Sequence, residues 1–218
     1  MSVQDFRERA RRGAGSKRRL VPVWRDVLLD TETPVAAFAK LRSGPFAFLL
    51  ESAPAGGETW ARYTFMGASP RAAWKLDDGV VRDWTPARGW HNDRRPSDPL
   101  TDLEALLAEC EPVDAPEIGE FWSGAVGYFS YDVARVIERL PAPPAKGVVV
   151  PDALFVFTDV LVIFDNLRSQ ARVVAAARVE AGASDDDLAR AYDGALRSVD
   201  ETIARLRSPA ALGPLDLD

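Results

Sequence analysis

The chain contains little of what builds metal centres, disulfide frameworks or nucleophilic triads. Its 218 residues include one cysteine, Cys110, and one histidine, His91. A single cysteine excludes an internal disulfide and is typical of the reducing cytosol, so we expect a cytoplasmic protein. A single histidine excludes a metal site made of several histidines. His91 lies in a polar stretch among charged residues, where we expect a solvated loop residue rather than a catalytic base.

The sequence also lacks long apolar runs, a basic excess and nucleotide-binding glycine motifs. The longest apolar run, 154–164, is interrupted by Thr158 and Asp159, whereas a membrane-spanning helix needs about 20 apolar residues. Lysine and arginine number 27 against 33 aspartate and glutamate residues, a net charge of −6. This balance argues against general binding to nucleic acid or to anionic membranes. There is no P-loop, G-x-S-x-G or G-x-G-x-x-G motif, so neither phosphate-cradling nor nucleophile-elbow chemistry is indicated.

What is present is a pattern of strand-rich blocks and separate helices. This pattern predicts an α+β fold with largely antiparallel, packed β-sheets and peripheral helices. Asp78-Gly79 is a strong two-residue hairpin signal because glycine adopts the positive φ that such turns require. A second, longer hairpin is predicted around residues 166–169. The predicted strands are 21–29, 46–51, 60–66, 72–76, 80–84, 122–129, 154–165 and 171–179.

Capping residues mark three helix starts. Thr33-Pro34 begins one helix, Asp98-Pro99 begins a second, and Ser184 begins the clearest, which ends near Ser208-Pro209. We also expect a solvated basic helix ending near Gly13 or Gly15 and a short helix over 131–140. Residues 85–98 and 111–118 are predicted loops, and Cys110 is expected to be a small buried group closing the face of the second helix. We expect 1–208 to form one domain and 209–218 to be a linker towards a further domain.

A polar pair follows the apolar strand 46–51. Glu51 and Ser52 end the tract Leu-Leu-Glu-Ser, just before the loop 53–58. A carboxylate can pair with an ammonium group, and a hydroxyl can both donate and accept a hydrogen bond, so this pair would suit an amino-acid ligand. Strands also commonly end in polar residues, and the residues alone favour this interpretation over a ligand site. The acidic run 185–187 is explained as a helix N-terminus and indicates no metal site.

Three longer tracts, considered together, resemble a known family. They are FLLES at 48–52, RYTFMGASP at 62–70 and GAVGYFSYDVAR at 124–135. In this order they resemble the N-terminal domain of anthranilate synthase component I. VPV at 21–23, DTETPV at 30–35, ERLP at 138–141 and Phe164-Asp165 fit the same family, so the resemblance runs from about residue 5 to 207. Asn166 stands where the family usually has histidine, and the family's chorismate-binding half would follow residue 218.

The resemblance implies a role in tryptophan biosynthesis. The parent enzyme would be a lyase that converts chorismate to anthranilate, with ammonia from a glutamine amidotransferase subunit. Its catalytic residues and its Mg²⁺ belong to the chorismate-binding domain. The resemblance therefore implies no catalytic residue, metal ligand or cofactor in this chain, which we expect to be inactive alone. It implies a partial feedback site for L-tryptophan at Ser52, followed by Glu51 and Leu50, with Pro22 as a further candidate.

Two alternatives stay open. One is the matching domain of aminodeoxychorismate synthase component I, although Glu51 and the ERLP tract favour anthranilate synthase. The other is a stand-alone, non-catalytic module that binds a ligand or a subunit. A nucleic-acid module is disfavoured by the acidic balance of the chain.

Overall fold

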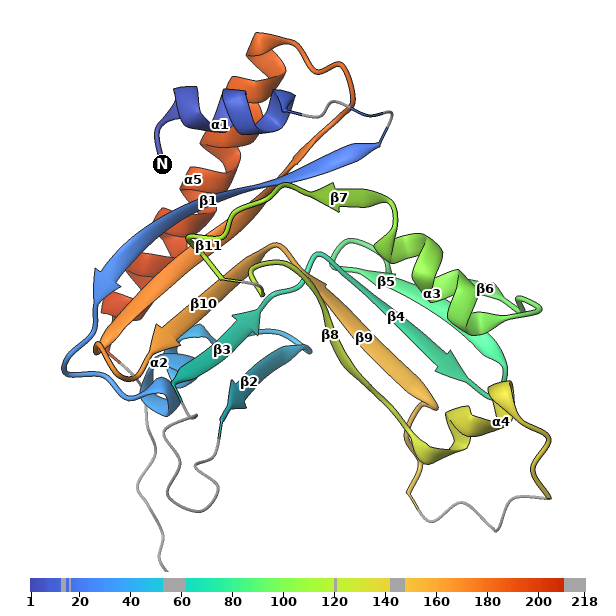
Figure 1. Ribbon diagram of the computed structural model, residues 1–218. Coiled ribbons are helices and arrows are strands. Elements are labelled where there is room, and N and C mark those ends of the chain that lie inside the picture. The colour runs from blue at the N-terminus through green and yellow to red at the C-terminus, as the bar shows by residue number, and fades with distance from the viewer. Residues whose placement is uncertain (13–14, 16, 53–61, 120, 142–147, 210–218) are drawn as a thin grey trace, which may run out of the picture. The chain divides into compact units, whose positions relative to one another are not determined.

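The computed structural model describes residues 1–12, 15, 17–52, 62–119, 121–141 and 148–209 (Figure 1). The chain divides into two compact units. The first draws on 1–69, 110–123 and 159–218, and the second on 70–109 and 124–158. Each unit is built on one β-sheet, and nearly all strand pairs are antiparallel, which confirms the predicted α+β fold.

The first unit contains a six-stranded sheet in the order β2-β3-β10-β11-β1-β7. Neighbouring strands run antiparallel except β1 and β7, which are parallel. β2 is the first strand in this order and forms one edge of the sheet. The strands are β1 (Arg18–Leu28), β2 (Ala47–Glu51), β3 (Tyr63–Ala68), β7 (Cys110–Pro112), β10 (Val160–Asp165) and β11 (Gln170–Val179).

Helices cover one face of this sheet (Figure 1). They are α1 (Val3–Arg11), α2 (Pro34–Leu41) and α5 (Asp185–Arg207). The predicted caps are confirmed: the Thr33 side chain accepts from the Ala36 N–H, and the Ser184 side chain accepts from the Asp187 N–H. The prediction of a solvated first helix was wrong. Phe6 is fully buried and packs edge-to-face on Tyr192, with ring centroids 5.5 Å apart, because α1 is amphipathic.

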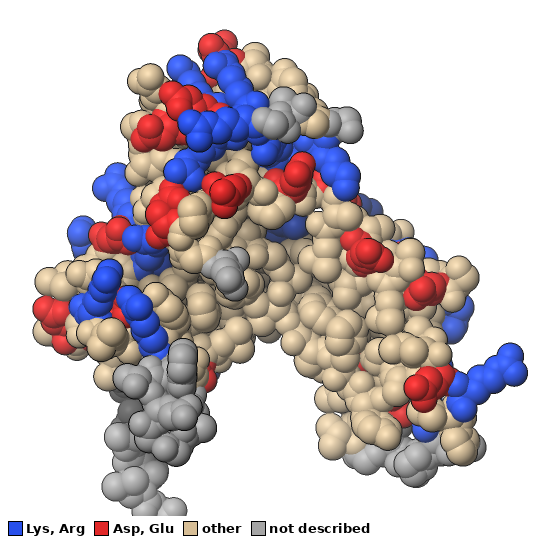
Figure 2. Space-filling model, in the orientation of Figure 1, with Lys and Arg blue, Asp and Glu red and all other residues tan. Residues whose placement is uncertain are grey.

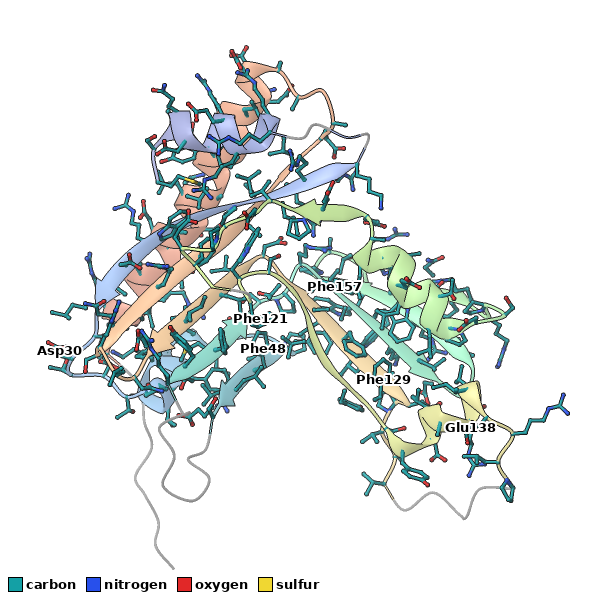
Figure 3. All side chains as sticks on the ribbon, in the orientation of Figure 1. Asp30, Phe48, Phe121, Phe129, Glu138 and Phe157 are labelled. Atoms are coloured by element: carbon teal, nitrogen blue, oxygen red, sulfur yellow. The ribbon has the colours of Figure 1, made fainter. Side chains whose placement is uncertain are left out.

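Within the first unit, the described residues cover the opposite face of the six-stranded sheet only in part. Ala115, Ile118 and Trp122 lie over it and pack in one cluster with sheet residues such as Leu161 and Val174. Towards β2 and β3 this cluster becomes aromatic and only half-buried. Phe65 belongs to that part, as do Phe48 and Phe121, which are labelled in Figure 3.

The second unit contains a five-stranded antiparallel sheet in the order β6-β5-β4-β9-β8. Its core includes the fully buried Trp74 and residues of α3 and of the short turn after β8. The elements are β4 (Ala72–Asp77), β5 (Val80–Thr85), β6 (Gly89–Arg94), α3 (Pro99–Leu107), β8 (Gly124–Phe129), the 3-10 turn η1 (Tyr131–Val133), α4 (Ala134–Ile137) and β9 (Ala153–Thr158).

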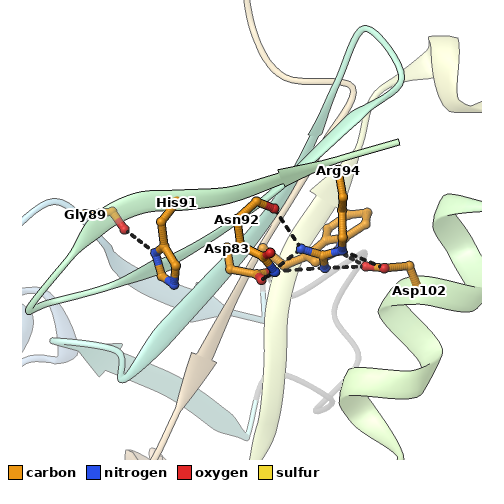
Figure 4. Close-up of polar contacts among 7 residues, drawn as sticks. Asp83, Gly89, His91, Asn92, Arg94 and Asp102 are labelled. Carbon is orange, nitrogen blue, oxygen red and sulfur yellow. Dashed lines mark hydrogen bonds and ion pairs between the residues drawn. The ribbon is translucent and has the colours of Figure 1, made fainter. Parts of the chain in front are cut away.

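A charged network ties α3 to this second sheet (Figure 4). The Arg94 guanidinium donates to Asp102 at 2.8 and 2.6 Å and to Asp83 at 2.8 and 3.0 Å. Asp102 also accepts from the Trp74 indole N–H at 2.8 Å. The Arg94 hydrogen bonds hold the pKa of Asp102 below its usual value, and Asp102 and Asp83 raise the pKa of Arg94. The network fixes α3 on the sheet.

Two loop predictions were wrong because polar segments pair as strands. Residues 85–98 contain β6, an edge strand paired with β5. His91 lies in β6, and its Nδ1 is 2.9 Å from the Gly89 carbonyl oxygen (Figure 4). β7 extends into the predicted loop 111–118. Cys110 opens this strand and is half-buried, so it does not close the face of α3, which ends at Leu107.

Three further predictions were wrong in extent or burial. The predicted strand 154–165 is two strands, β9 and β10, that join different sheets and meet at Asp159. The predicted buried strand 122–129 begins at Gly124 and is the edge strand β8, whose Phe129 is exposed. The predicted helix 131–140 is the turn η1 followed by α4, and it ends at Ile137.

Candidate ligand site

The end of β2 carries three of the four residues predicted to bind a ligand. Leu50 pairs with Phe65 of β3, and Glu51 pairs with Thr64. Ser52 follows the strand directly and is exposed; its hydroxyl donates to the Tyr63 carbonyl at 3.5 Å, a long and therefore weak hydrogen bond. The Ser52 hydroxyl is thus accessible at the edge of the sheet and makes only one weak hydrogen bond that is described.

Leu50 and Glu51 lie on opposite faces of the sheet because successive strand residues alternate. Phe65, opposite Leu50, belongs to the half-buried aromatic cluster, so Leu50 lies on the partly covered face. Thr64, opposite Glu51, pairs in turn with Phe164 of the helix-covered core. A ligand that contacts both Leu50 and Glu51 must therefore sit at the strand end.

Pro22 is not brought together with the other three residues. It lies in β1, opposite Ala176, and is buried. β1 is four strands away from β2 in the sheet order, which corresponds to roughly 19 Å at the usual strand spacing. One amino-acid ligand cannot span this distance, so the geometry separates Pro22 from the site at the end of β2.

A cavity that the sequence did not predict lies on the same partly covered face. Its volume is about 540 Å³. β3, β10 and β11 form its floor, which includes Tyr63, Phe65 and Ile163, and residues 116–119 with Phe121 form a wall. Phe121 meets Phe65 edge-to-face there, with ring centroids 5.3 Å apart. The cavity brings together residues distant in sequence, so only the strand register reveals it.

Two ion pairs flank the cavity. Arg62 donates to both carboxylate oxygens of Asp165, at 3.1 and 2.6 Å. Arg172 donates to both oxygens of Asp26, at 2.6 and 3.0 Å. The hydrogen bonds from Arg62 lower the pKa of Asp165, and the same contact raises the pKa of Arg62. Arg168 adds a third guanidinium 3.9 Å from Asp165.

The basic residues of α1 do not form a continuous positively charged surface. Figure 2 shows Lys and Arg interleaved with Asp and Glu over this part of the surface. Arg9 pairs with Glu117 at 2.5 Å, and Arg11 pairs with Asp185. Among the described residues, no group of three or more histidine, cysteine, aspartate or glutamate side chains is arranged to hold a metal ion. No helix of the described part is long and apolar enough to span a membrane.

Comparison with solved structures identifies the class of fold. The crystal structure of anthranilate synthase component I from Streptococcus pneumoniae TIGR4 matches with a TM-score of 0.54 and 23% identity, covering 88% of this chain and 39% of that chain. The two proteins therefore share the fold.

Sequence comparison goes further. The chain is 33% identical over 191 residues to anthranilate synthase component 1 of Aquifex aeolicus, covering 86% of the chain and 37% of the relative. It is 33% identical over 226 residues to the Arthrobacter globiformis protein of the same name, covering 99% of this chain and 40% of the relative. The chain is thus homologous to the N-terminal part of anthranilate synthase component 1. It spans about 40% of the length of these relatives, and no family model matches it.

Proposed function

We propose that this chain acts as the N-terminal, tryptophan-sensing part of an anthranilate synthase component I in the cytoplasm. The observation that supports this proposal most strongly is the 33% sequence identity with a component 1 relative over 99% of the chain. The relatives from Aquifex aeolicus, Mycobacterium bovis and Arthrobacter globiformis bear the name anthranilate synthase, which favours this enzyme over aminodeoxychorismate synthase.

The proposed tryptophan site is the end of β2. Ser52 would hydrogen-bond the ligand, since its hydroxyl is accessible and weakly held. Leu50, 45% exposed, would contact the indole ring. Glu51 is exposed at the strand terminus and would pair with the ammonium group. Pro22 is left out because it is buried four strands away.

These three residues would form only half of a site. They lie on an edge strand and its terminus, so they would contact a ligand there from one side only. The chorismate-binding part of component I would supply the other side, together with the catalytic residues and Mg²⁺. A glutamine amidotransferase subunit would supply ammonia. Tryptophan would then inhibit by binding more tightly to one arrangement of the two parts than to another.

The test is a chimera. Residues 1–218 are joined to the part of Arthrobacter globiformis component 1 that lies beyond the matched region, and assayed with chorismate, Mg²⁺ and ammonium. We expect 2-aminobenzoate to form and L-tryptophan to inhibit its formation, with the intact relative as the positive control. An active chimera that tryptophan does not inhibit would refute the sensing role.

A further inference from the structure

We infer that the cavity between β3, β10, β11, residues 116–119 and Phe121 is a second binding site, which takes a planar aromatic carboxylate without an alkylammonium group. All residues that line the cavity belong to the first unit. The inference uses only these residues and does not rest on the proposed function. Its volume of about 540 Å³ falls within the usual range of small-molecule sites, about 300–1,000 Å³.

The apolar part of the cavity suits a flat ring. Phe65 and Phe121 meet edge-to-face, and Tyr63 lies beside Phe65 with centroids 6.3 Å apart. Ile163, opposite Phe65 on β10, completes this surface. Aromatic and branched apolar walls of this kind bind an aromatic ring through its faces and edges.

The polar end of the cavity suits a carboxylate. Arg62 and Arg168 both approach the single carboxylate of Asp165, so two positive charges face one negative charge. Arg62 is committed to Asp165 through two hydrogen bonds. The Arg168 side chain is 67% exposed, and its 3.9 Å separation from Asp165 is too long for a hydrogen bond. Its planar donor fork matches a ligand carboxylate.

The same charges select against amino acids. The excess of guanidinium charge beside Asp165 repels an alkylammonium group held next to the ligand carboxylate. The other two carboxylates of the lining are also paired, Asp26 with Arg172 and Glu117 with Arg9. Those carboxylates are therefore neutralised and do not offer a site for an ammonium group. An aromatic acid whose ring substituents are uncharged suits this lining.

The probe is 2-aminobenzoate, which is fluorescent, and the matched neutral probe is 2-aminobenzamide. Each is titrated into the 218-residue chain at neutral pH. We expect saturable binding of the acid and at least tenfold weaker binding of the amide, because a hydrogen bond to a charged group is then lost. Absence of saturable binding at millimolar concentrations, or equal affinity for the two probes, would overturn the inference.

Two variants locate the site. Arg168→Gln should raise the Kd for 2-aminobenzoate about tenfold and leave the Kd for the amide unchanged, whereas Phe121→Ala should weaken both probes. Arg88→Gln, an exposed arginine of the second unit, is the matched control. A Kd insensitive to Arg168→Gln and Phe121→Ala would place the binding elsewhere and refute the assignment.

Discussion

Leu50 and Glu51 are consecutive residues of one edge strand, yet their side chains lie on opposite faces of the six-stranded sheet. Leu50 pairs with Phe65 of the half-buried aromatic cluster, and Glu51 pairs with Thr64, which neighbours the helix-covered core. An apolar contact and a carboxylate are thereby presented one residue apart, followed by the hydroxyl of Ser52. A zwitterionic ligand can use all three only at the strand end, and this sets the expected effects of substitution.

Ser52→Ala should reduce feedback inhibition selectively. In the active chimera we expect the tryptophan concentration for half-inhibition to rise up to about tenfold, since one hydrogen bond to the ligand is lost. Turnover without tryptophan should stay nearly unchanged. Ser97→Ala, at an exposed serine of the second unit, is the control. A parallel loss of turnover and inhibition would instead assign Ser52 a structural role.

Glu51→Gln tests where the ligand sits. If the ammonium group reaches round the strand end, loss of the charge should raise the half-inhibitory tryptophan concentration several-fold, because a charge-assisted hydrogen bond becomes neutral. Glu109→Gln, exposed in the second unit, is the matched control. Unchanged inhibition would show that tryptophan contacts only the Leu50 face of the sheet.

Asp102→Asn should destabilise the second unit in a pH-dependent way. The bonds from Arg94 and Trp74 lower the folded-state pKa of Asp102, so its contribution is fully present above the unfolded pKa of about 3.9. We expect a loss of about 1–3 kcal/mol at pH 7, seen as a fall in Tm of several degrees. The difference in Tm between wild type and variant should shrink as the pH falls from 5 to 3. Asp93→Asn, on a more exposed ion pair, is the control; a difference constant with pH would contradict the account.

Gly127→Ala and Gly194→Ala should have opposite effects on stability. A Cβ on Gly127 would lie 2.0 Å from the Leu154 carbonyl oxygen, a backbone atom of β9 that cannot swing away. We expect a loss of about 1–3 kcal/mol or more, as in overpacked cores. Gly194 lies in α5 with room for a methyl group, so alanine should stabilise by about 0.5–1 kcal/mol. Urea unfolding measures both, and equal effects would contradict the strand geometry.

The sequence predicted those parts of the fold that local chemistry determines. The caps at Thr33 and Ser184 and the turn at Asp78-Gly79 are confirmed, because each depends on residues adjacent in the chain. β6 was missed because its pairing with β5 compensates for a polar sequence. The division of 154–165 between two sheets at Asp159 was missed because hydrophobic periodicity does not specify which sheet a strand joins.

The candidate sites show the same limit. The tract at Leu50–Ser52 was singled out in the sequence as a polar strand end, and the resemblance to anthranilate synthase component I implied its ligand. Its division between two faces follows only from the register with β3. The distance to Pro22 and the cavity around Phe65 and Phe121 depend on the strand order β2-β3-β10-β11-β1. That order is set by long-range packing.

The most direct test of the half-site is a calorimetric titration of L-tryptophan into the isolated 218-residue chain and into the active chimera. We predict weak or undetectable binding to the isolated chain, because on the proposed function Leu50, Glu51 and Ser52 would contact only one side of the ligand. The chimera should bind at least a hundredfold more tightly, and Ser52→Ala should weaken that binding. Equally tight binding by the isolated chain would contradict the account, since it would show that the tryptophan site is complete within these 218 residues.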